Sequence, residues 1–447
     1  MITIQDSIVL GPILILLMGC IFISIKTRFI QLRAIPHMFT LLKQSLMSTE
    51  ESAHAVRAHK ALFSAMATTI GISNITGPLI AIHYGGPGAL LGYLLATIFG
   101  GAATFAEVTF ALTFKDPAPA GERIGGPMFY LNQVFPRFVS FFYALCGLIL
   151  IIMWSGAQSN SLASMLSPYD IPHWLCGGLL AGFTLFVIAG GIKRVSTIAE
   201  KLVPLMFLLY MATMLWIVGC NASSLPGVLG TVITEGLYPK ALGIGAALGS
   251  VFHSLRWGLS KAFKCSESGI GTSTIPHAMA DTENAVDQGI LSIVSVYSNG
   301  ILCLLSGLVV LLTGTDKMVT VGDLNLGAIT TIFAHYFPFV GPTILLFSAT
   351  LFVITTVIGN SYNGGQFYRY LFGTRGIGIY YLITAASIFI FSGLTVTFTT
   401  QLEDYLLLPV IVPHIIGIVL LTMRHYSMIT LNHSSRYCGG ITTHDTV

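Results

Sequence analysis

The stretch TTIGISNITG, Thr68 to Gly77, places glycines, hydroxyls and an amide in the middle of an apolar run, residues 61–83. Backbone groups inside a membrane need partners within the protein, and a helix of this composition is prone to unwind. Unwound backbone offers carbonyl oxygens to a cation, and the amides that begin the next half-helix attract a carboxylate. These residues therefore predict a broken helix that binds an ion and a small substrate near residues 71–74.

Two further segments carry polar or small residues at the centre of apolar runs. ALGIGAALGS, Ala241 to Ser250, has closely spaced glycines that predict a second break, although such spacing also serves close helix packing alone. FVITTVIGNSYNGG, residues 352–365, has Thr355 and Thr356 at its centre. Their hydroxyls can complete a shell of neutral oxygens around sodium. The alternative is that each threonine bonds the carbonyl group four residues earlier in its own helix.

Ionisable residues within apolar runs are costly and usually functional, and here they are His83, Glu107, His253 and Arg256. We expect Glu107 to form a structural ion pair with a basic residue, the alternative being a proton relay. His83 is expected to be solvated, and His253 and Arg256 to line the inner exit path. Since none of them falls in the predicted pocket, that pocket has no fixed charge and suits a small zwitterion.

The elements that must position these residues are membrane helices. The chain has 447 residues, of which 54% are hydrophobic and 9% charged, with a mean hydropathy of +0.81. A soluble domain has about 25% charged residues, so an integral membrane protein is indicated. The net charge of +3 comes without a basic cluster, so no nucleic-acid partner is expected. The seven cysteines form no C-x-x-C pair, and the N-terminus lacks the basic residues of a signal peptide.

About 20 apolar residues cross a bilayer, and the sequence predicts eleven spans. Residues 29–48 are amphipathic and predict a helix on the membrane surface. The predicted spans are 8–26, 61–83, 88–113, 138–165, 173–190, 199–219, 241–260, 288–314, 341–371, 377–395 and 405–423.

The distribution of basic residues predicts the orientation of the chain. Of the lysines and arginines, 18 follow odd-numbered spans, whereas only Lys240 and Lys317 lie on the opposite side. Because cytoplasmic loops are enriched in these residues, the N-terminus is expected outside and the C-terminus in the cytoplasm.

The two glycine-interrupted spans are the second and the seventh. The seventh comes five spans after the second, and five is odd, so two five-helix units would run in opposite directions. This is typical of transporters with inverted repeats and a site at mid-depth. The expected organisation is a leading helix and surface helix (1–60), a first repeat (61–220), a second repeat (241–423) and a cytoplasmic tail (424–447).

Several segments resemble a known family, the alanine or glycine:cation symporters (AGCS). They run in the family's order, cover most of residues 60–420, and are ALFSAMATTIGISNITGPLIAIHYGGPGALLGYLLATIFGGAATFAEVTFAL (61–112), GGPMFYL (125–131), GGIKRVSTIAEKLVPLM (190–206), SLRWGLSKAFKCSESGIGTSTIPHAMA (254–280) and FVITTVIGNSYNGGQFYRYLFG (352–373). The resemblance implies an all-α polytopic membrane protein with a LeuT-like five-plus-five inverted repeat after one extra helix.

The resemblance also implies which residues form the sites. Sodium would bind the carbonyl groups of Thr69 and Ile72 and the hydroxyls of Thr355 and Thr356. The substrate would meet Gly71, Ser73, Asn74, Gly245, Ala246, Ala247, Thr356 and Asn360.

The sequence departs from the family pattern at the site itself. The family's G-T-G-N-I-A-G is GISNITG here, which puts Ile72 and Ser73 at the family's threonine and second glycine. The β-carbon of Ser73 makes distorted backbone harder to reach. The family's F-S-N-E-A-G is FKCSESG, and its usual tryptophan in the T-T-x-x-G-W segment is Asn360, which predicts a larger and more polar pocket.

The expected function is sodium-coupled symport of a small neutral amino acid (alanine, glycine or D-alanine) by alternating access. The protein would lie in a cell membrane, the inner membrane of a bacterium, with no cofactor besides the coupling ion. The departures leave the amino acid and the ion open. A proton-coupled permease of the same fold is the alternative, in which Glu107 or His253 would titrate. A membrane-embedded enzyme would need a metal cluster or a nucleophile–base set, and an ion channel a symmetric pore; neither pattern is present in the sequence.

Overall fold

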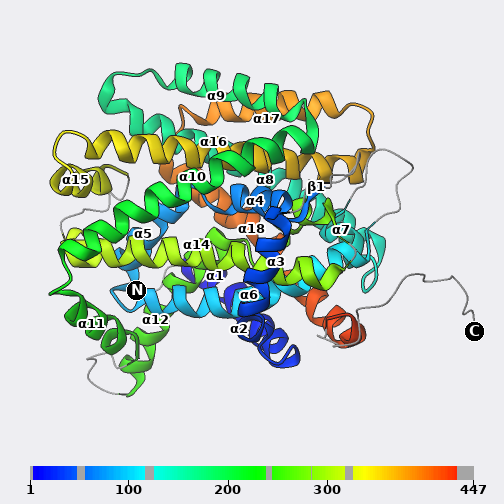
Figure 1. Cartoon of the computed structure of the whole chain (residues 1–447), viewed down its shortest axis with the longest axis horizontal. Coiled ribbons are helices and arrows are strands. Elements are labelled where there is room, and N and C mark those ends of the chain that lie inside the picture. The colour runs from blue at the N-terminus through cyan, green and yellow to red at the C-terminus, as the bar shows by residue number, and fades with distance from the viewer. Residues whose placement is uncertain are drawn as a thin grey trace, which may run out of the picture.

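The computed structural model describes residues 4–47, 56–115, 125–237, 244–282, 284–317 and 326–429, and these residues are almost entirely helical (Figure 1). The helices up to residue 237 are α1 (Ile4–Lys26), α2 (Ile30–Arg33), α3 (Ile35–Met47), α4 (Ala58–Thr69), α5 (Ser73–Gly85), α6 (Ala89–Thr113), α7 (Pro127–Leu131), α8 (Arg137–Leu166), α9 (His173–Ile188), α10 (Gly191–Cys220) and α11 (Leu225–Leu237).

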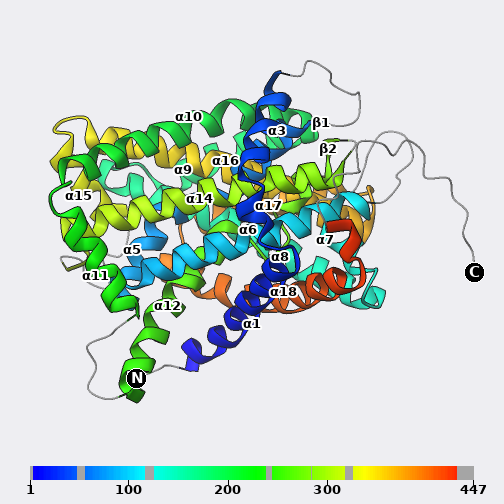
Figure 2. The ribbon, with the colours of Figure 1, turned by 60° about the horizontal axis from the view of Figure 1, so that its bottom comes forward.

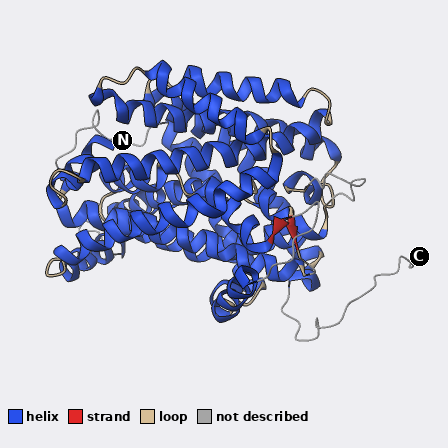
Figure 3. Ribbon diagram, turned by 45° about the horizontal axis from the view of Figure 1, so that its top comes forward, coloured by secondary structure: helices blue, strands red, loops and turns tan. Residues whose placement is uncertain are grey.

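The second half continues with long helices. They are α12 (Ile244–Ser266), α13 (Thr274–Ala278), α14 (Ala285–Thr313), α15 (Leu326–Tyr336), α16 (Gly341–Phe372), α17 (Ile377–Phe391) and α18 (Val396–Arg424). A parallel pair of two-residue strands, β1 (Val56–Arg57) and β2 (Ala280–Asp281), lies at the start of α4 and after α13 (Figure 3).

The distribution of polarity is that of a membrane protein. Large apolar side chains such as Phe138 and Leu179 are about two-thirds exposed or more, at 72% and 68%, whereas Asn74, Glu107 and His414 are completely buried. A protein surface in water rarely exposes apolar area on this scale, but lipid accepts it, and polar groups must then find partners inside.

Among the described residues, six helices are long and apolar enough to cross a bilayer, and the bent pair α4 and α5 makes seven spans if it forms one. Shorter apolar helices at Gly11–Lys26, His173–Ile188 and Ile377–Phe391 coincide with three more predicted spans. The count of eleven spans stays a prediction. The predicted surface helix at 29–48 is helical but divided into α2 and α3, because Phe29 and Ala34 interrupt the helical run before each of them.

The predicted break of the second span is confirmed. Helix α4 ends at Thr69, Ile70 adopts an extended conformation (φ −93°, ψ 95°), and α5 begins at Ser73 with its axis bent by 44° from that of α4.

The prediction of a break within residues 241–250 is wrong for the described part of that segment. Helix α12 runs without interruption from Ile244 to Ser266, and its glycines remain helical. The chain leaves the helix instead at residues 267–273, where Glu267, Gly269 and Gly271 have φ angles of 55°, 78° and 94°. Left-handed φ angles end an α-helix, and glycine reaches them at little cost, so the break follows the glycines at 269 and 271.

The two broken elements lie against each other. Helix α5 packs on α12, and α4 packs on α13, so the interruptions at 70–72 and 267–273 face the same interior region. In Figures 1 and 2, α5, α11, α12 and α15 gather at one end of the molecule, and the strand pair and α7 lie at the other. The long helices α6, α8, α10, α14 and α16 connect the two ends.

Candidate functional site

The break between α4 and α5 exposes backbone carbonyl groups that have no helical partner. The Thr69 carbonyl accepts a hydrogen bond from the side-chain amide of Asn299 on α14, at 2.8 Å. The Ile70 carbonyl accepts one from the hydroxyl of Thr356 on α16, at 3.1 Å. Two separate helices therefore hold the unwound backbone in place.

The amide groups of the break are held in a similar way. The Gly71 N–H donates to Asn74 Oδ1 at 2.9 Å, and the Ile72 N–H points to Gln158 Oε1 on α8 at 3.4 Å. A β-carbon on Gly71 would lie 2.9 Å from the Thr356 hydroxyl oxygen, so a glycine at position 71 permits the close approach of α16.

The two threonines that the sequence pairs at a sodium site differ in their contacts. Thr356 reaches the break, as described above, and its oxygen keeps lone pairs for a cation. Thr355 instead donates to the Leu351 carbonyl of its own helix at 2.9 Å, and its oxygen lies 3.3 Å from the sulfur of Met206. For Thr355, the alternative of a bond to its own helix is therefore the arrangement observed.

A cavity of about 550 Å³ lies beside this break, between α4, α5, α8, α12, α15, α16 and α18. It brings five of the predicted site residues together on its wall: Thr69, Ile72, Ser73, Thr356 and Asn360. Gly71 and Asn74 are buried next to them, in the backbone turn just described. The volume is within the range of small-molecule sites, roughly 300–1,000 Å³.

The seventh span was predicted to reach the substrate through residues near the start of α12, but the described structure shows it at the cavity near the end of that helix. Gly245, Ala246 and Ala247 lie in the first turn of α12, where the side chains are outside the described part of the structure, so their role stays a prediction. The same helix reaches the cavity near its other end through Cys265, whose Sγ lies 3.4 Å from the Ser73 carbonyl oxygen.

The expectation of a pocket without fixed charge is wrong, because Lys261, Lys264, Glu267 and Glu403 all line the cavity. The Lys264 ammonium forms an ion pair with Glu403 on α18, with Nζ and Oε2 2.5 Å apart. The two lysines were not predicted to line the pocket because the predicted seventh span ends at residue 260, whereas α12 continues to Ser266. Their i, i+3 spacing was the available signal, since it places both on one helix face.

Glu107 stabilises the second break rather than forming the expected ion pair with a lysine or arginine. Its Oε1 accepts a hydrogen bond from the Gly269 N–H at 2.7 Å, and His414 Nδ1 is 4.0 Å from the same oxygen. The Gly269 carbonyl is in turn bonded to His414 Nδ1 at 2.8 Å, and the Tyr143 hydroxyl donates to the Ile270 carbonyl at 2.6 Å. Side chains from three helices thus hold the backbone of this break.

His253 and Arg256 lie where α12 meets the end of α5. His253 Nε2 is 2.8 Å from the Tyr84 carbonyl oxygen, and the Arg256 guanidinium lies 5.4 Å from the centre of the Trp257 ring. His83 packs edge-on against Tyr84 and is partly exposed. None of these three side chains lines the described cavity. The part of His253 and Arg256 in an exit path stays a prediction.

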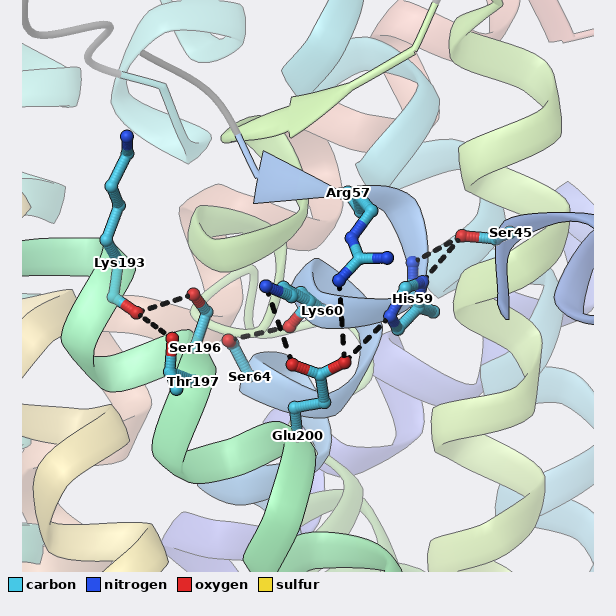
Figure 4. A network of polar contacts seen from close by, with 9 residues as sticks. All are labelled: Ser45, Arg57, His59, Lys60, Ser64, Lys193, Ser196, Thr197 and Glu200. Atoms are coloured by element: carbon cyan, nitrogen blue, oxygen red, sulfur yellow. Dashed lines mark hydrogen bonds and ion pairs between the residues drawn. The ribbon is translucent and has the colours of Figure 1, made fainter. Parts of the chain in front are cut away.

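A polar network lies at the N-terminal end of α4, the end away from the break (Figure 4). Glu200 on α10 lies 3.1 Å from His59, 3.5 Å from Lys60 and 3.9 Å from Arg57, and His59 is also 3.0 Å from the Ser45 hydroxyl. This cluster ties the first turn of α4 to α10. It was not predicted, because Glu200 lies 141 residues after His59 in the chain.

Comparison with known proteins identifies the family. The model of the sodium:alanine symporter family matches residues 1–437. A sodium/alanine symporter, AgcS, from Methanococcus maripaludis is 29% identical over 427 residues, which cover 93% of each chain.

Solved structures share the fold. The substrate-bound outward-open state of a Na⁺-coupled sialic acid symporter superposes with a TM-score of 0.57 over 96% of this chain and 93% of that one, at 12% identity. MhsT in complex with L-phenylalanine has a TM-score of 0.53, at 15% identity, over 81% of this chain and 88% of its own. Both are LeuT-fold neighbours of this all-helical membrane protein. The chain belongs to the sodium:alanine symporter family, whose members are sodium-coupled amino-acid transporters rather than enzymes.

Proposed function

We propose that the protein carries a small neutral amino acid, such as alanine, glycine or D-alanine, into the cell together with sodium. The observation that carries this proposal is the hydrogen bond between the Thr356 hydroxyl and the Ile70 carbonyl, at the wall of the cavity. It joins α16 to unwound backbone at the point where carbonyl and hydroxyl oxygens are concentrated.

The proposed sodium ligands are the carbonyl groups of Thr69 and Ile72 and the hydroxyls of Thr355 and Thr356. The Thr355 oxygen would bind the ion through its lone pairs while its hydrogen is donated to the Leu351 carbonyl. Unwound backbone in the middle of a membrane offers carbonyl oxygens without the desolvation of a fixed carboxylate, as sodium sites of this kind require. An ion there would order the break, and ordering the break would complete the substrate site, so binding of the two ligands is positively coupled.

The proposed substrate site lies at the start of α5. The positive end of the dipole of this half-helix attracts the substrate carboxylate, next to Gly71, Ser73 and Asn74. Asn360 and Thr356 line the same cavity from α16, and Cys265 lines it from α12. These polar side chains lie among apolar ones such as Ile72 and Trp154 on the same wall. This combination fits an amino acid with a short side chain.

The proposed movement is alternating access by two inverted five-helix repeats, residues 61–220 and 241–423, after the leading segment 1–60. The pairing of α5 with α12 and of α4 with α13 supports this organisation, because corresponding half-helices of two inverted repeats meet around one site. The proposed orientation has the N-terminus outside and the tail after residue 424 in the cytoplasm, from the excess of basic residues on that side.

Uptake into proteoliposomes tests this function. Radiolabelled alanine, D-alanine, glycine and serine are offered in turn under an inward sodium gradient or an inward proton gradient. We expect accumulation of at least one of them with sodium and none with protons alone. Accumulation driven by protons alone would favour the alternative permease, with Glu107 or His253 as the group that titrates.

A further inference from the structure

Lys261 is a buried ammonium on the wall of the substrate cavity. Its residue is only 9% exposed, and it lines the cavity from α12. Within the part of the chain that the structure describes, no carboxylate lies within ion-pair distance of its nitrogen. Its recorded contact is with the aromatic face of Trp257, 5.8 Å from the ring centre.

The other charged groups of the wall are already engaged. Lys264 and Glu403 neutralise each other at 2.5 Å. The Glu267 carboxylate accepts a hydrogen bond from the Thr272 hydroxyl, inside the second break. Lys261 is left with a cation–π contact to Trp257. Such a contact offsets only a small part of the free energy that burying an ammonium costs, whereas a nearby anion would offset more.

The position of Lys261 matches a second anionic group on a substrate. Cys265 lies beside Ser73 at the start of α5, and Lys261 precedes Cys265 by four residues, about 6 Å along the helix. The two backbone positions are thus about one helical turn apart, so a substrate with its α-carboxylate at the start of α5 can reach toward Lys261 with a side chain that bears a second carboxylate.

From these observations we infer that Lys261 determines specificity by binding the side-chain carboxylate of a substrate, so that the cavity takes short acidic amino acids such as L-aspartate. The inference rests on the proposed function, since it places the substrate in the same cavity. It extends that function from neutral to acidic amino acids.

Competition between closely matched ligands tests the inference in the unmodified protein. Sodium-driven uptake of radiolabelled alanine into proteoliposomes is measured with increasing L-aspartate or L-asparagine, which are nearly identical in shape and differ in side-chain charge. We expect aspartate to inhibit at a concentration about tenfold or more below asparagine, the difference that a charged hydrogen bond makes. Equal inhibition by both, or inhibition by asparagine alone, would overturn the inference and leave the proposed function intact.

Variants then assign the effect to the residue. Lys261→Met should lower the ratio of aspartate to asparagine potency by about 10- to 100-fold, and Lys261→Arg should restore most of it. Lys201→Met removes an exposed lysine of α10 and should change neither potency. An unchanged ratio in Lys261→Met would refute the role of Lys261.

The two proposals fail in different ways. If alanine is not taken up but labelled aspartate accumulates with sodium, the neutral substrate is wrong and the inference holds. If no amino acid of the panel accumulates or binds, the proposed function fails and the inference with it.

Discussion

The hydrogen bond between Glu107 and the Gly269 N–H allows a sharp test of what Glu107 does. Glu107→Ala removes the acceptor and leaves a buried N–H unpaired, which costs about 1–3 kcal/mol. The loss of its buried methylene groups adds about 1 kcal/mol or more. Glu107→Gln keeps a carbonyl oxygen at the same place, so its cost should stay near 1 kcal/mol, the net value of one hydrogen bond.

The assay compares the two variants with the unmodified protein in thermal unfolding in detergent and in sodium-driven alanine uptake. We expect Glu107→Gln to keep most of the stability and the uptake, and Glu107→Ala to lose at least about 2 kcal/mol and most of the uptake. A Glu107→Gln variant that is as stable as the original but transports nothing would refute a positioning role. Such a result would favour a proton relay through Glu107.

Further predictions concern the first break and the opposite end of α4. Gly71→Ala puts a methyl group 2.9 Å from the Thr356 hydroxyl oxygen, so we expect the free energy of unfolding to fall by about 1–3 kcal/mol and the KM for sodium to rise. Gly182→Ala is the control, because a β-carbon at position 182 meets no neighbouring atom within 4 Å, and it should change neither quantity. Equal effects of the two substitutions would contradict the packing argument. Glu200→Gln weakens three contacts to basic side chains, so the unfolding free energy, measured by thermal unfolding in detergent, should fall by about 1 kcal/mol at low salt and by less at high salt. A loss that does not depend on salt would show that those ion pairs are not its cause.

The first break could be predicted from the sequence because its cause is local. Gly71, Ser73 and Asn74 combine weak helix propensity with side chains that bond nearby backbone, and Asn74 does bond the Gly71 N–H. The position of the polar groups within the apolar run then indicated the depth of the site.

The second break could not be located in the same way. Glycines in ALGIGAALGS and in ESGIGTS are equally able to leave a helix, and the choice between them depends on distant partners. The backbone of the second segment is bonded by Glu107, Tyr143 and His414, and these residues come from other helices. Local spacing contains no information about such contacts.

The charged wall of the cavity was missed for a related reason. Lys261 and Lys264 were assigned to a cytoplasmic loop by the rule that basic residues mark loop ends. That rule fails where a lysine is paired inside the protein, as Lys264 is with Glu403.

In the proposed mechanism, Thr356 joins the sodium site to the unwound backbone. The most direct measurement is the sodium dependence of alanine uptake in Thr356→Val and Thr356→Ser, with correct folding checked by thermal unfolding. Valine keeps the shape but has no oxygen, so we predict that Thr356→Val loses sodium-driven uptake, and that Thr356→Ser, which keeps the hydroxyl, retains it with a modestly higher KM for sodium. Uptake by a folded Thr356→Val variant with an unchanged sodium dependence would contradict the account.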